Sequence, residues 1–122
     1  MPRLPRDPDT HLPLKPSTYR VLLALAGGDW LHGYAIMQAV AEMSHGRETI
    51  LPGTLYAALA RMVEDGLIDT RDADDNEASG GPKRRYYRTT PFGLAVARAE
   101  SERLRALLDI AVAHKILGGP RR

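Results

Sequence analysis

Residues 52–66 read PGTLYAALARMVEDG and predict an amphipathic helix. Pro52 suits the first turn of a helix, where its missing N–H costs no hydrogen bond. Four apolar side chains then recur at helical spacing on one face, namely Leu55, Leu59, Met62 and Val63. Gly66 ends the helix because glycine adopts the left-handed C′ conformation without strain. Once the apolar face is buried, the side chains left exposed are Thr54, Tyr56, Ala57, Ala60 and Arg61.

Two shorter helices are predicted before this one. The first begins with Ser17 as its N-cap residue and ends at the glycine pair 27–28. The second runs from about His32 to Met43, with apolar side chains recurring on one face and His32 as a helix-start residue. Three short helices separated by tight breaks are typical of a helix-turn-helix domain.

After the third helix the pattern becomes extended. Residues 67–71 and 85–89 are rich in side chains that suit strands, and a polar segment with a Gly-Pro tip lies between them. This arrangement predicts a β-hairpin. Thr90 as N-cap and Pro91 in the first turn then begin a long helix that is expected to reach Leu117.

The predicted fold class is therefore mainly α with a small β-hairpin: a winged helix-turn-helix followed by a long C-terminal dimerisation helix. Residues 1–16 are expected to form an extended proline-rich arm, 17–90 the winged domain, 91–117 the C-terminal helix and 118–122 a tail. The arm is either a loose tail or a basic contact with a polyanion.

Two aromatic residues are assigned to packing inside this fold. Trp30, between the first two helices, is expected in the core. Neighbouring residues of a strand point to opposite faces, so one of Tyr86 and Tyr87 must pack inward. Tyr87 is predicted to be the inward one.

The composition excludes several classes of protein. The chain has 122 residues, a net charge of +2 and no cysteine, which favours one domain and excludes disulfide scaffolds and Cys-ligated zinc. The four histidines are scattered and no HExxH, GxSxG or glycine-rich phosphate loop is present, so we expect no enzyme activity, metal site or cofactor. The N-terminus lacks the apolar stretch of a secretion signal, which predicts a cytoplasmic, nucleoid-associated protein.

Three motifs carry a resemblance to a known family. Residues 32–36 read HGYAI, residues 52–68 read PGTLYAALARMVEDGLI, and residues 81–93 read GPKRRYYRTTPFG. In this order, and from Tyr19 onward, the chain resembles the PadR-like transcriptional regulators, with the motifs as second helix, recognition helix and wing. The resemblance implies a homodimer that binds double-stranded DNA at a palindromic operator, represses transcription and is released by a small-molecule effector.

The candidate DNA contacts come from the start of the second helix, the recognition helix with the residues just before it, and the wing. The N–H groups at the start of the helix and its dipole favour phosphate, arginine suits guanine or phosphate, and tyrosine hydroxyls suit phosphate. The wing carries the densest basic cluster of the chain. The candidates are Tyr34, Thr49, Pro52, Gly53, Thr54, Tyr56, Arg61, Lys83, Arg84 and Arg85.

Some of these candidates also have an interpretation without DNA. Arg61 lies four residues before Asp65, so the two can form an ion pair on the helix surface. Tyr34 and Tyr56 can be packing residues. The cations of the wing can be balanced across the hairpin by the acidic side chains of residues 72–77.

Departures from the family pattern support a second function. Leu51 stands where the family commonly has a serine that can cap the helix and bind phosphate, so Thr49 or Thr54 is expected to substitute. Residues 72–77 make the wing unusually acidic. The alternative is therefore a winged-helix protein-interaction module that does not bind DNA.

The C-terminal helix carries an apolar stripe that a small domain cannot cover. Its spacing alternates between three and four residues, which is typical of helices that pack against a partner. The resemblance implies dimerisation through this helix, and folding back onto its own subunit is the alternative. The candidate dimer contacts are Leu94, Ala97, Leu104, Leu107, Leu108 and Ala111.

Overall fold

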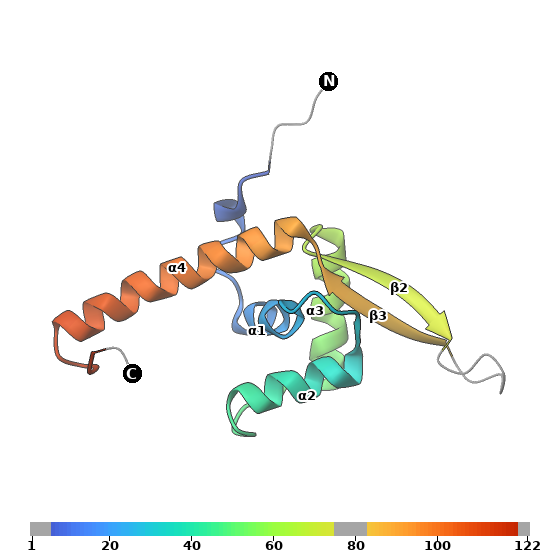
Figure 1. The fold of residues 1–122 in the computed structure, drawn as a ribbon, viewed down its shortest axis with the longest axis horizontal. Helices are drawn as coiled ribbons and strands as arrows, with labels where there is room; N and C mark the ends of the chain where they lie inside the picture. The colour runs from blue at the N-terminus through green and yellow to red at the C-terminus, as the bar shows by residue number, and fades with distance from the viewer. Residues whose placement is uncertain (1–5, 75–82, 120–122) are drawn as a thin grey trace.

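The computed structural model describes residues 6–74 and 83–119 (Figure 1). Its elements are the 3-10 helix η1 (Pro8–His11), α1 (Pro16–Leu25), β1 (Leu31–His32), α2 (Gly33–Met43), α3 (Pro52–Glu64), β2 (Ile68–Asp74), β3 (Lys83–Thr89) and α4 (Pro91–Ala113). The prediction of a mainly α fold with a small β-hairpin and a long C-terminal helix is confirmed. The β2–β3 hairpin projects to one side of the three short helices and the far part of α4 to the other (Figure 1). Among the described residues, no helix is both long and apolar enough to cross a membrane.

One hydrophobic core joins the three short helices, the sheet and the first turns of α4. The predicted apolar face of α3 is confirmed, since Leu55, Leu59 and Met62 are buried. Tyr87 is the inward tyrosine, as predicted, and burial raises the pKa of its hydroxyl. The buried apolar residues are Val21, Leu22, Leu25, Ile36, Val40, Leu55, Leu59, Met62, Leu67, Ile68, Tyr87, Val96 and Ala97.

The sheet is antiparallel and has the order β1–β3–β2. The predicted hairpin is confirmed, and its register places Ile68 opposite Thr89 and Asp72 opposite Arg85. The short strand β1 pairs Leu31 with Tyr87. The sequence did not predict β1, because two residues are too few to show an alternating pattern.

Trp30 packs against arginine side chains of β2 and β3, so the prediction that it is a core residue is wrong. The guanidinium carbons of Arg71 and Arg88 each lie 4.5 Å from the centroid of the Trp30 ring. These are cation–π contacts. The ring remains partly exposed because β1 brings it beside the arginines of the sheet and not beneath the helices.

Two helix boundaries differ from the predicted ones. α1 begins at Pro16, with Lys15 as N-cap residue and no capping side chain, so Ser17 is already inside the helix. α4 ends at Ala113, and the prediction that it reaches Leu117 is wrong. Lys115 adopts a left-handed φ of 60°, and the N–H of Ile116 donates to the carbonyl of Ala111 at 2.9 Å. This Schellman-type closure ends the helix before the glycines that the sequence marks as its end.

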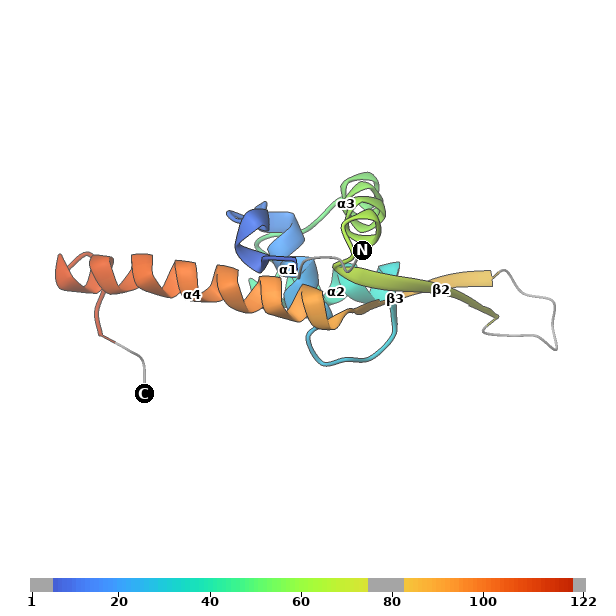
Figure 2. The ribbon, with the colours of Figure 1, turned by 90° about the horizontal axis from the view of Figure 1, so that it is seen from above.

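The N-terminal segment belongs to the packed fold, and the prediction of an extended arm is wrong for its described part. Residues 8–11 form η1, and Leu12 and Leu14 pack against the core. The Arg6 guanidinium donates to the carbonyl of Asp65 at 2.9 Å and lies 4.4 Å from the centroid of the Phe92 ring. The two leucines bury apolar surface against the core. Figure 2 shows from above that η1 lies beside α4.

Gly93 lies where α4 crosses the start of β2. A Cβ atom there would collide with the carbonyl oxygen of Leu67 and lie 2.6 Å from Oγ1 of Thr89. We expect Gly93→Ala to lower the free energy of unfolding by about 3 kcal/mol, because backbone must move to admit the methyl group. Gly27→Ala is the matched control, since a Cβ at Gly27 meets nothing within 4 Å. Urea unfolding followed by circular dichroism measures both, and equal stability of the two variants would contradict the close contact.

Glu100 is a buried carboxylate, 2% exposed, that joins α4 to the N-terminal segment. It accepts hydrogen bonds from Arg103 Nη2 at 3.0 Å and from the Leu14 N–H at 3.2 Å. The Arg103 hydrogen bond is the main cause that lowers the pKa of Glu100.

A lowered pKa in the folded state predicts a dependence of stability on pH. The ionised carboxylate stabilises the fold above the pKa of Glu100 in the unfolded chain, about 4.3, and this contribution is lost as the pH falls through the folded pKa. Glu100→Gln should therefore be less stable than the wild type at pH 7, with the difference shrinking below about pH 4. Thermal melts across this range measure the effect, and a constant difference at every pH would refute it.

Candidate nucleic-acid interface

The N-terminus of α3 is an exposed helix end without a capping side chain. Leu51 is the N-cap residue and makes no side-chain hydrogen bond to the helix. Pro52, Gly53 and Thr54 are all exposed. The first backbone N–H groups of α3 therefore point outward, and the helix dipole favours an anion at this end.

The tyrosine–arginine hollow lies between the start of α2, α3 and β3. It has a volume of about 340 Å³ and is lined by His32, Gly33, Tyr34, Tyr56, Arg84 and Arg85. Four of the predicted DNA contacts from three elements thus meet around one space. His32 was not among them, although its ring caps α2 by accepting the Ala35 N–H at 3.2 Å. His32 reaches the hollow because β1 pairs with β3, and no local sequence pattern predicts that pairing.

Tyr56 forms the wall between two hollows. Its hydroxyl lies against Gly33, where a Cβ would approach it to 2.5 Å, so a larger residue at the start of α2 would displace the Tyr56 side chain. A second hollow of about 360 Å³ lies on the other side of the ring, and Arg85 lines both. Tyr56 is 49% exposed. Its ring is thus a packing element while its hydroxyl borders the hollow.

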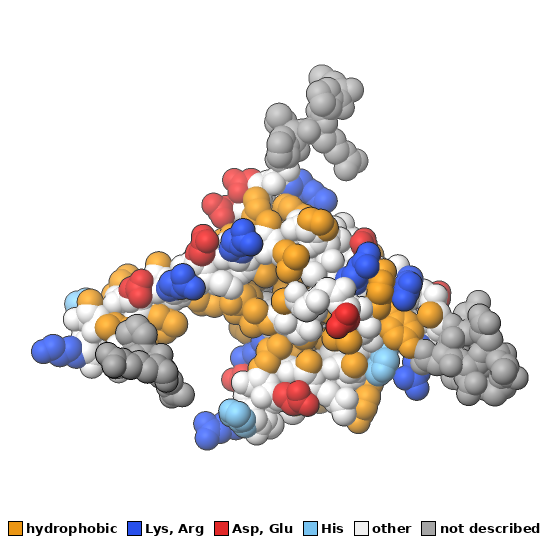
Figure 3. Space-filling view, in the orientation of Figure 1, with side chains coloured by type: hydrophobic (Ala, Val, Ile, Leu, Met, Phe, Trp, Pro, Cys, Tyr) orange, Lys and Arg blue, Asp and Glu red, His pale blue; other side chains and the backbone are white. Residues whose placement is uncertain are grey.

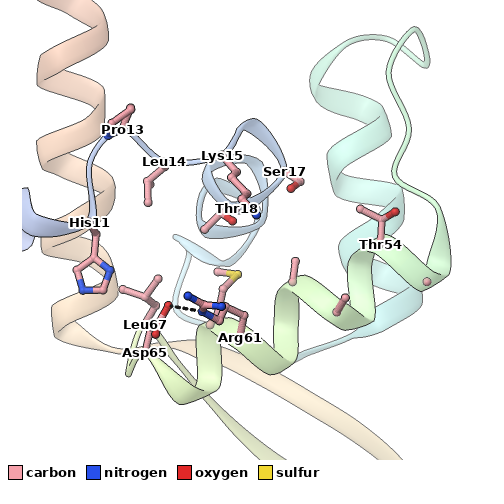
Figure 4. Close-up of a pocket in the computed structure, with 14 residues that line it drawn as sticks. His11, Pro13, Leu14, Lys15, Ser17, Thr18, Thr54, Arg61, Asp65 and Leu67 are labelled. Atoms are coloured by element: carbon pink, nitrogen blue, oxygen red, sulfur yellow. Dashed lines mark ion pairs between the residues drawn. The ribbon is translucent and has the colours of Figure 1, made fainter.

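The arm-side groove runs along the opposite side of α3. It has a volume of about 770 Å³ and lies between α3 and the segment that leads into α1 (Figure 4). Thr54, Ala57 and Arg61 line its α3 wall. The structure therefore separates Thr54 and Arg61 from the two tyrosines.

Arg61 lies on the surface of α3 beside Asp65. Its Nε is 3.5 Å from Oδ2 of Asp65, and its side chain is 77% exposed (Figure 4). The helix-surface ion pair weighed from the sequence is thus present. A pair this exposed contributes little to stability, so the guanidinium is available to other partners.

The hairpin brings opposite charges together across its two strands. Arg85 Nε donates to Oδ1 of Asp72 at 3.0 Å, and both side chains are more than half exposed. This hydrogen bond is the main cause that raises the pKa of Arg85. Lys83 lies in β3, but its side chain is outside the described part of the chain. Residues 75–82, which include the tip of the wing, are outside it as well.

Thr49 lies apart from both the hollow and the groove. It is an exposed residue of the loop between α2 and α3. Glu48 anchors this loop through an ion pair with Arg20, and its N–H donates to Oγ of Ser44 at 2.7 Å. The loop is therefore held in place close to the N-terminus of α3.

The predicted dimer contacts lie mostly on the part of α4 that projects from the body. Leu107 and Leu108 are 52% and 54% exposed, and Figure 3 shows hydrophobic side chains over this part of the helix. Leu94 is also exposed, whereas Leu104 and Ala111 are half-buried. The structure corrects the prediction for Ala97, which is buried in the core of its own subunit because it lies in the first turns of α4. Ile110, 56% exposed, was not among the predicted contacts.

Comparisons with known proteins agree with this architecture. The chain is 36% identical over 98 residues to the transcriptional regulator Rv3488 of Mycobacterium tuberculosis, with 80% of each chain covered. It resembles the crystal structure of a PadR family transcription regulator from Clostridium difficile, at 25% identity and a TM-score of 0.63, with 80% of this chain and 96% of that chain covered.

A further structure of similar fold is Bacillus subtilis PadR in complex with operator DNA. It is 21% identical with a TM-score of 0.58, and the match covers 67% of this chain and 45% of that one. Residues 21–99 match the family described as transcriptional regulator PadR-like. This match includes α2, α3 and both long strands, so the chain belongs to the PadR-like family of transcriptional regulators.

Proposed function

We propose that this regulator is a homodimeric repressor that binds a palindromic operator and is released from it by a small molecule. The observation that carries the proposal is the tyrosine–arginine hollow, where Tyr34 and Tyr56 meet Arg84 and Arg85 beside the start of α3. Hydroxyl and guanidinium donors around one space suit a phosphate of the DNA backbone. A phosphate held there fixes the orientation of α3 on the duplex.

With that phosphate bound, α3 enters the major groove. Gly53, Ala57 and Ala60 are exposed and small, which permits close approach to the groove wall. Thr54 and Arg61 supply polar groups that can hydrogen-bond to base edges. The B. subtilis neighbour, which was crystallised with operator DNA, supports this use of the fold.

A second copy of the chain covers the projecting part of α4. Exposed leucines and isoleucines on a helix that leaves the body of the domain favour a partner. Two-fold symmetry then presents two copies of α3 to half-sites about 34–36 Å apart, one turn of DNA. This symmetry is the reason to expect a palindromic operator.

The arm-side groove is where we place the small-molecule effector. Its volume of about 770 Å³ falls in the range of ligand pockets, and α3 forms one wall. A molecule bound there changes the surface that α3 offers to DNA. In this proposal the protein acts in the cytoplasm, at the nucleoid, by binding DNA and not by catalysis.

The second candidate function is a protein-interaction module that does not bind DNA. Leu51, 71% exposed beside the start of α3, favours it, because a leucine cannot bind phosphate. A gel shift with the DNA upstream of the protein's own gene separates the two functions. A complex that survives random competitor DNA supports the repressor, and the absence of any complex at low salt supports the module.

Dimerisation can be tested on the α4 stripe. Replacing Leu104 and Leu108 together by aspartate puts charges into the proposed interface, so monomers should result and operator affinity should fall at least tenfold. Light scattering measures the mass, and Glu102→Gln is the control for an exposed change on the same helix. A double variant that is folded and still dimeric excludes this interface.

The roles of Arg61 and Tyr56 can be separated by operator substitution. Arg61→Ala should cost about 1–3 kcal/mol of binding free energy and relax the preference at one base pair of each half-site. Tyr56→Phe should weaken binding to all sequences alike, because a hydroxyl on phosphate carries no sequence information. Affinities for a panel of single-base operator variants measure both. If Arg61→Ala keeps the wild-type preference, Arg61 is not a base reader.

A further inference from the structure

Asp72 and Arg85 form a cross-strand ion pair whose geometry is set by the sheet. The two residues are directly opposite in the β2–β3 register, and Nε of Arg85 donates to Oδ1 of Asp72 at 3.0 Å. Neither side chain has to reach far, because opposed residues of antiparallel strands lie close together. The pair differs from Arg61–Asp65, which is separated by 3.5 Å along one helix.

Arg85 also occupies a central place at the proposed DNA surface. It lines the tyrosine–arginine hollow and the second hollow behind Tyr56. A phosphate bound in the first hollow would therefore lie beside a guanidinium that already neutralises a carboxylate. If Arg85 keeps Asp72, that carboxylate repels the phosphate, and if Arg85 turns to the phosphate, the ion pair is lost. Asp72 opposes DNA binding in both cases.

We propose that Asp72 limits the affinity of this surface for DNA by competing with phosphate for Arg85. The inference rests on the proposed DNA-binding function. Non-specific binding comes almost wholly from phosphate contacts, whereas operator binding adds contacts to bases. A contact to phosphate carries no sequence information, so the competition lowers the affinity for operator and for random DNA by a similar factor.

The test uses Asp72→Asn, Arg85→Ala and the double variant in the full chain. Asparagine keeps the size and the hydrogen-bond acceptor and removes the charge. Glu102→Gln, an exposed change on α4, removes the same charge far along the chain from the hairpin and is the matched control. Asp72→Thr, which suits a strand, is the second variant if asparagine disturbs the hairpin.

The probes are a random-sequence duplex and the duplex upstream of the protein's own gene, measured by fluorescence anisotropy at several salt concentrations. We expect Asp72→Asn to bind the random duplex about threefold to fivefold more tightly at low salt. We also expect the slope of log K against log salt to steepen by up to about one, because Arg85 is released to phosphate. The gain should be a similar factor for the upstream duplex, because both duplexes offer the same phosphate to Arg85.

The double variant isolates the competition. Arg85→Ala should cost more affinity in the Asp72→Asn background than in the wild type. Equal costs in both backgrounds, or an equal gain from Glu102→Gln, would overturn the inference while leaving DNA binding in place. If no variant binds either duplex at low salt, the proposed function itself fails, and the inference fails with it.

Discussion

Thr90 joins the three parts of the molecule that the proposed function requires. Its hydroxyl donates to the carbonyl of Gly66 at 2.7 Å, just after α3, and accepts the N–H of Gly93 at 2.9 Å in the first turn of α4. Its own N–H donates to the carbonyl of Leu67 at 3.0 Å, where the wing begins. One residue therefore links the recognition helix, the base of the hairpin and the C-terminal helix through satisfied hydrogen bonds.

The hydrogen bonds of Thr90 fix the angle between α3 and α4. Gly93 allows the backbone of α4 to contact that of Leu67, and Arg6 adds a hydrogen bond to the end of α3 while stacking on Phe92 of α4. A dimer formed along α4 would then place its two α3 helices at a defined separation. A molecule that moves the N-terminal segment would act on the same junction, which is a physical route from effector to operator.

Two arginines of the candidate interface are paired with carboxylates of the same chain. Arg61 and Arg85 each have an acidic partner in the described structure, and Arg71 and Arg88 lie against Trp30. A net charge of +2 is small for a protein that is to hold a polyanion. Affinity in such a protein depends on donors that converge on particular phosphates, and the hollow around Tyr34 and Tyr56 provides that convergence.

The amino-acid sequence alone determined the helices of the winged domain and the residues that end them, because periodicity, proline and glycine act over a few neighbouring residues. The apolar face of α3, the cap at Thr90 and the inward direction of Tyr87 were predictable for this reason. Only the tertiary structure placed Trp30 against two arginines, packed the N-terminal segment on α4, buried Ala97 and brought Tyr34, Tyr56 and Arg85 around one space. These contacts join residues far apart in the chain, and their geometry follows from strand register and core packing, which no local pattern encodes.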